Sequence, residues 1–281
     1  MTASLAMLLQ TQLDPRLDVD ALIAQMRSDW PDLDPGLLKP TAPAEIPAGS
    51  EVMSIDYDGW LIALMPIPAP IGDDIATICA HSRLWPNAAP APVDYAAHTL
   101  VTVMGFGTDA VEREDIVRTT LLSKVLASAI ALSDSIQAVY FGSANHVVQP
   151  TLFRELACEM LPAPLTIAWV ALNVGPRPDG VMTGHTRGMD MLGLMDIEIP
   201  VTRESAEDAL GRLSGICAYL IENGQVIEDG HTLGGSEDEH IRVVFAPSAL
   251  DDGRQVMSLQ YEAVEAAPEA AERPWWKRLL N

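Results

Sequence analysis

The stretch EREDIVRTTLLSKVLASAIAL, residues 112–132, has the clearest helical pattern in the chain. Its apolar side chains recur every three or four positions and form one wide stripe along a helix. The members of this stripe are Ile116, Val117, Leu121, Leu122, Val125, Leu126, Ala129 and Ile130. An apolar run over residues 138–141 follows and indicates a strand. The stretch therefore predicts a long helix packed beside a sheet.

Residues 51–262 are expected to form two similar halves, residues 51–162 and 163–262, and this helix belongs to the first. In the first half we expect strands over 52–57 and 60–65, joined by a turn at Asp58-Gly59, and a strand over 98–104. In the second half we expect strands over 165–174, 195–201, 241–246 and 256–261, and a helix over 205–223. Each half runs strand, strand, helix, strand. The sequence thus predicts an α+β fold, a ferredoxin-like duplication with a mainly antiparallel sheet.

Two segments lie outside these halves. Residues 1–50 are expected to hold two short helices, Leu5–Leu13 and Asp18–Trp30, followed by a proline-rich linker. Residues 263–281 are expected to be a mobile acidic tail that ends in an aromatic and basic motif. Trp275, Trp276, Leu279 and Leu280 would form one face of a short helix there, which could dock on its own domain or on a partner.

Composition limits the class of function. The net charge of −22 argues against nucleic acid, whose phosphates attract clustered Lys and Arg. No apolar run is long enough to span a membrane, and no signal peptide is recognisable. Three widely spaced cysteines favour free thiols in a reducing compartment, so we expect a cytoplasmic protein without disulfides and without a cofactor.

Several motifs together carry a family resemblance. In the first half they are residues 64–68, Trp85, residues 98–103 and residues 138–140; in the second half they are residues 186–189, 192–199, 229–234 and 247–248. In order and spacing the chain resembles the bacterial domain of unknown function DUF4261 from about Trp60 onward. The resemblance implies a stand-alone cytoplasmic bacterial protein, and it brings no established catalytic residues.

One polar group is a candidate ligand site. Arg187 lies in a glycine-flanked loop, and the period of two along a strand puts Asp196 and Glu198 on the same side. Arg187 could bind an anion that the two acids help to orient. The interpretation that we favour is a solvated acidic face on which Arg187 pairs with one of the carboxylates.

Asp229 and His231 are a second candidate, within a loop rich in acids. Such residues could bind a divalent ion, but the spacing fits no metal motif, so we predict no metal site. The chain also has no nucleophile elbow, Walker A loop or dinucleotide fingerprint, so we assign no catalytic residue.

These observations favour a non-catalytic protein that binds another protein, in the manner of an immunity- or secretion-associated factor. The alternative is a small-molecule or metal-dependent enzyme whose site, between the two halves, would combine Arg187, Asp196, Glu198, Asp229 and His231. The partner and the oligomeric state are left open by the sequence.

Overall fold

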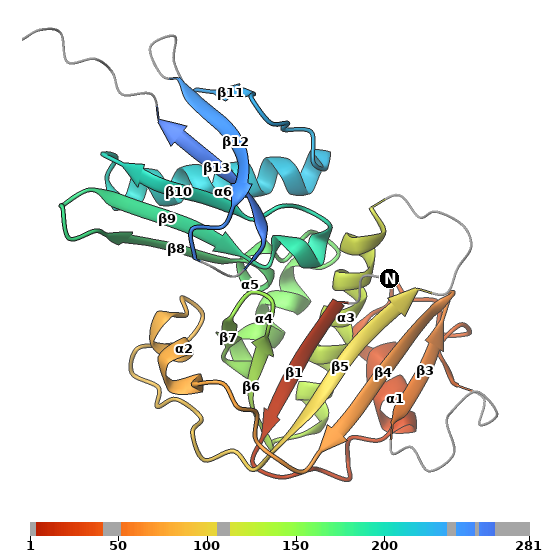
Figure 1. Ribbon diagram of the computed structural model, residues 1–281. Coiled ribbons are helices and arrows are strands. Elements are labelled where there is room, and N and C mark those ends of the chain that lie inside the picture. Colours follow the sequence, from red (N-terminus) through yellow and green to blue (C-terminus); the bar gives the residue numbers. More distant parts are fainter. Residues whose placement is uncertain (1–3, 42–51, 106–112, 235–239, 251–252, 262–281) are drawn as a thin grey trace, which may run out of the picture.

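The computed structural model describes residues 4–41, 52–105, 113–234, 240–250 and 253–261. Within these residues the chain forms two β-sheets with helices packed on them (Figure 1). The first sheet has the strand order β2-β3-β4-β5-β1-β6-β7, and the second has the order β11-β12-β13-β10-β9-β8. Of the strand pairs described, the pair of β10 with β13 is parallel and the others are antiparallel. The α+β class and the mainly antiparallel pairing are confirmed, whereas the ferredoxin-like duplication is not.

The first sheet combines strands from residues 1–50 with strands from the first half. Its strands are β1 (Ser4–Gln10), β2 (Lys39–Pro40), β3 (Met53–Tyr57), β4 (Trp60–Ile67), β5 (Ala97–Gly105), β6 (Ile136–Phe141) and β7 (His146–Val148). The turn predicted at Asp58-Gly59 is confirmed, because both residues have positive φ, 47° and 80°, and close the β3–β4 hairpin.

The helix predicted over Leu5–Leu13 is wrong, because these residues supply strand β1. β1 lies between β5 and β6, and both of its faces are covered by apolar side chains: Leu8 packs in the larger core on one side and Leu9 in a smaller core on the other. A strand buried on both faces has no polar alternation and cannot be told from a buried helix by periodicity. The amino-terminal strand is therefore central to the first sheet.

Helices cover both faces of this sheet. Three of them, α1 (Val19–Asp29), α3 (Glu114–Leu132) and α4 (Pro150–Met160), pack together on one face, and α2 (Ile75–His81) packs on the other. The predicted helices at 18–30 and 112–132 are confirmed over their described residues. The Asp18 side chain accepts a hydrogen bond from the Ala21 amide (2.8 Å) and so fixes the start of α1.

The second sheet packs against one long helix, α6 (Ala206–Asn223), which lies across β8 and β9 (Figure 1). Its strands are β8 (Ala171–Pro176), β9 (Met182–Arg187), β10 (Ile197–Thr202), β11 (Thr232–Leu233), β12 (Ile241–Pro247) and β13 (Gln255–Tyr261). The predicted helix is confirmed, with the Ser205 hydroxyl accepting from the Asp208 amide at its start. The strand predicted over 165–174 is correct only in its second part, because the short helix α5 (Thr166–Trp169) precedes β8.

A short junction joins the two sheets. The buried Trp169 indole donates to Ser123 Oγ on α3 (2.8 Å), and His146 Nδ1 donates to the Ala168 carbonyl oxygen (3.2 Å). The 3₁₀ turn η2 (Met189–Leu192) packs against α3. Gly188, just before this turn, has φ +106°, and a Cβ atom there would lie 2.4 Å from the Trp169 carbonyl oxygen.

We predict that Gly188→Ala destabilises the protein by about 2 kcal/mol or more, because the new methyl group meets backbone at a φ that alanine avoids. Urea unfolding followed by tryptophan fluorescence measures the change. Gly211→Ala on α6 is the matched control, since its Cβ would meet nothing within 4 Å and alanine favours a helix by up to about 1 kcal/mol. Equal stability of the two variants would contradict the tight packing at the junction.

Candidate binding cleft

Arg187 and Glu198 meet inside the second sheet. β9 and β10 are neighbours, and Arg187 Nη2 lies 3.5 Å from Glu198 Oε1. The Ser248 hydroxyl donates to Glu198 Oε1 (2.6 Å) and accepts from Arg187 (3.2 Å), and the Ala249 amide donates to Glu198 Oε2 (2.8 Å). Both oxygens of this carboxylate therefore have protein partners.

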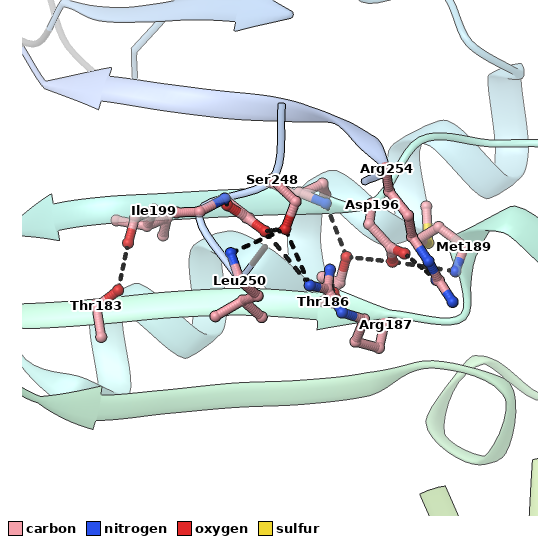
Figure 2. Close-up of polar contacts among 12 residues, drawn as sticks. Thr183, Thr186, Arg187, Met189, Asp196, Ile199, Ser248, Leu250 and Arg254 are labelled. Atoms are coloured by element: carbon pink, nitrogen blue, oxygen red, sulfur yellow. Dashed lines mark hydrogen bonds and ion pairs between the residues drawn. The ribbon is translucent and has the colours of Figure 1, made fainter. Parts of the chain in front are cut away.

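Asp196 belongs to the same network. Its Oδ1 accepts from the Thr186 hydroxyl (2.9 Å) and the Met189 amide (3.2 Å), and its Oδ2 lies 3.4 Å from Arg254 Nη1 (Figure 2). Burial raises the pKa of this carboxyl above its usual value, against the opposing effect of these hydrogen bonds. Asp196 thus helps to hold β9, the η2 turn and the segment between β12 and β13 together.

The solvated acidic face that we favoured is wrong. Asp196 is 3% exposed and Glu198 is 4% exposed, because Ser248 and Ala249 cover Glu198 and Arg254 covers Asp196. The accompanying prediction that Arg187 pairs with one of the acids is confirmed. Ser248 and Arg254 complete the network, and no spacing rule links them to β10.

Asp229 and His231 lie elsewhere. Asp229 Oδ1 accepts from the Phe245 amide on β12 (2.8 Å), and His231 Nδ1 accepts from the Glu228 amide (3.2 Å); both residues are exposed. β13 separates β12 from β10, and two strand spacings amount to roughly 10 Å. The five residues of the enzyme hypothesis therefore do not surround one ligand, and no cluster that could hold a metal occurs in the part of the chain that the structure describes.

The partner-binding residues predicted in the tail, Trp275, Trp276, Leu279 and Leu280, lie outside the described residues. Their role stays a prediction.

An open cleft with a volume of about 1610 Å³ lies between the two sheets. The first half contributes the end of α2, the loop that follows it and the β6–β7 turn; the second half contributes α5, the whole of β8, part of β9 and one face of α6. β8 is the last strand of its sheet, so the cleft runs along a sheet edge. Arg187 also lines the cleft, which places the buried network directly behind its wall.

The charge of this lining differs from that of the chain. Arg83, Arg187 and three histidines line the cleft, whereas Glu207 is the one carboxylate among its described lining residues. Arg83 is exposed and reaches across to β8, where its Nε donates to the Leu172 carbonyl oxygen (3.2 Å). Because Arg187 is paired with Glu198, Arg83 is the described lining residue whose positive charge can attract an anionic group.

Sequence reasoning missed the members of this cleft. Arg83 and His146 stand in no motif, and only the fold brings residues so far apart in the chain to one surface. The sequence did predict the region, because a site was expected between the two halves.

The fold and the cleft define an α+β protein with two sheets and an open cleft between them. Residues 185–260 match the family model of a domain of unknown function, DUF4261. The match spans β9 to β13 and includes the buried network, while the motifs quoted from the first half lie outside it. No curated protein and no solved structure matches the chain. None of the helices in the described ranges has the length and apolar character needed to cross a membrane.

We predict strong coupling between Arg187 and Glu198. Arg187→Met alone leaves a buried carboxylate without its cation and costs about 3 kcal/mol, whereas adding Glu198→Gln removes the unpaired charge. A double-mutant cycle by urea unfolding should give about 2 kcal/mol of coupling. The exposed pair Arg177–Asp179 is the control and should show less than about 1 kcal/mol. Additive effects of the Arg187 and Glu198 changes would show that the network does not depend on this ion pair.

We also predict a pH effect from His146, because burial lowers the pKa of this histidine to about 4. Between pH 6.5 and 4 the unfolded chain binds more protons than the folded chain, so stability falls as the pH falls through this window. His146→Asn keeps a donor toward Ala168 but cannot titrate. Between pH 7 and pH 5 the wild type should lose about 2 kcal/mol more unfolding free energy than this variant. Equal losses would show that His146 titrates normally.

Proposed function

We propose that the protein is a non-catalytic binding protein that holds a partner protein in the cleft between its two sheets. The observation that carries the proposal is the cleft itself, whose walls come from both halves and include a complete edge strand. Pockets between packed units are common places for ligands. The open shape along a strand suits a polypeptide better than a small molecule enclosed on all sides.

The arrangement of the carboxylates supports binding rather than catalysis. A general acid or base must reach the reacting atom, but Asp196 and Glu198 are buried and accept hydrogen bonds from protein donors. The enzyme alternative also needs Asp229 and His231. Asp229 contacts β12, which is two strands away from β10 in the sheet. The candidate enzyme site therefore has no convergent set of residues.

The setting of this binding is also part of the proposal. A cytoplasmic, immunity- or secretion-associated role fits a chain with many acidic residues and without recognisable catalytic motifs. The strong negative charge disfavours nucleic acid as the partner, so the proposed partner is a protein.

Ile167→Glu tests the proposal. Ile167 lines the cleft and is 46% exposed, so a carboxylate there should leave the fold intact and weaken a partner in the cleft at least about tenfold. Val201→Glu is the matched control, since Val201 is 44% exposed on β10 and is not part of the cleft lining. Affinity capture from the source cells measures how much of a stoichiometric partner each tagged variant retains.

The expected result is loss of the partner from Ile167→Glu and its retention by Val201→Glu. Equal retention by both variants would place the partner outside the cleft. Failure of the wild-type chain to retain any stoichiometric protein would count against a binding function altogether.

A further inference from the structure

We infer that the cleft binds an extended, carboxylate-bearing segment of a partner protein as an additional strand on β8. This inference rests on the proposed function and specifies how the partner is held. It depends on which backbone groups of β8 point away from β9, and on the charge that faces them.

Three independent observations show which residues of β8 point outward. The Arg177 amide donates to the Val181 carbonyl oxygen (2.8 Å), so the pairs 177–181, 175–183, 173–185 and 171–187 are the hydrogen-bonded ones in this antiparallel register. The residues between them direct their N–H and C=O groups to the other side. Leu172 agrees, because its carbonyl accepts from Arg83 across the cleft. Pro176 agrees too, because proline is tolerated where a strand needs no donor.

The outward groups are therefore the N–H and C=O of Leu172 and Val174 and the C=O of Pro176. Among the described residues, Arg83 provides a hydrogen bond to one of them, at Leu172. They line a cleft that is open to solvent and long enough to follow the whole strand. A row of such groups on an edge strand is a template for another strand, which is how several peptide-binding domains gain affinity.

The charge of the ligand follows from Arg83. A strand added to β8 would donate its own N–H to the Leu172 carbonyl and displace the Arg83 Nε group. The released guanidinium would then lie beside the new strand, and within the described residues it forms no ion pair of its own. A carboxylate side chain on the added strand would pair with this guanidinium. An extended acidic segment thus satisfies both the strand edge and the cation.

The test uses the full chain labelled with ¹⁵N and a capped peptide of about eight residues that alternates threonine and glutamate. We expect saturable chemical-shift changes and slower hydrogen exchange at the Leu172 and Val174 amides. A lysine counterpart and a glutamate peptide that is N-methylated at alternate residues should bind at least about tenfold more weakly, since each lacks one element of the recognition.

Val174→Pro removes an outward N–H without removing a β8–β9 hydrogen bond, so we expect it to weaken peptide binding at least about tenfold. Val174→Ala is the matched control, because it shortens the side chain, keeps the N–H and should bind close to the wild-type level. Arg83→Gln should weaken the glutamate peptide selectively. The N-methylated peptide gives the same information if Val174→Pro does not fold.

Binding without protection of the β8 amides, equal binding of the lysine peptide, or no binding at millimolar concentration would each overturn the inference. Protection of Val174 that is already present in the free chain and disappears on removal of residues 262–281 would identify the chain's own tail as the occupant and overturn the partner assignment. If Ile167→Glu releases the captured partner while Val174→Pro retains it, strand addition fails and cleft binding stands. If both variants retain it, both proposals fail.

Discussion

The Trp169 indole at the junction is the interaction on which the rest of the structure depends. It is fully buried, and its Nε1 group donates to Ser123 in the middle of α3. Removing a buried tryptophan side chain costs about 3–5 kcal/mol, so the fold depends strongly on this one residue at the junction. The Trp169 carbonyl oxygen also limits how close the end of β9 can come to α5, because Gly188 packs against this oxygen. The indole and the glycine together fix the distance between the two sheets, and the cleft is the space left beside that contact.

The buried network explains why the cleft wall on β9 is firm. Arg187 is at once part of the lining and part of the network that ties Glu198 and Ser248 together. A side chain held by buried partners loses little further freedom when a ligand arrives. The other wall is different, because Arg83 is exposed and its one hydrogen bond to β8 can exchange for a bond to a ligand. One wall of the cleft thus holds Arg187 in place, and the other presents Arg83, whose bond to β8 a bound segment can replace.

Local patterns predicted the two long helices and one tight hairpin. The helices at 114–132 and 206–223 and the hairpin at Asp58-Gly59 follow from apolar periodicity, a capping serine and turn chemistry. Prediction failed where both faces of an element are buried, as in β1, and where an apolar run divides between a helical turn and a strand, as in α5 and β8. In those places the tertiary contacts, which sequence spacing does not contain, decide the conformation.

The site was harder to predict for a related reason. The alternation at Asp196 and Glu198 correctly indicated a strand with both acids on one side, but it could not indicate that Ser248, Ala249 and Arg254 cover the two acids. Whether a polar face is solvated or buried depends on segments far away in the sequence. The prediction that Arg187 pairs with an acid was correct because a buried charge needs a partner in any fold.

The local charge of the cleft is compatible with the acidity of the whole chain because electrostatic range in salt is short. At physiological ionic strength the screening length is about 8 Å, so a carboxylate in the cleft interacts mainly with the charges that line it. There it meets Arg83 and one glutamate, Glu207, among the described residues, while the carboxylates of Asp196 and Glu198 are buried behind Arg187 and neutralised by their partners. The net charge of −22 therefore describes the outer surface. Within the cleft, an acidic segment can approach the basic side chain of Arg83 and the edge of β8 together.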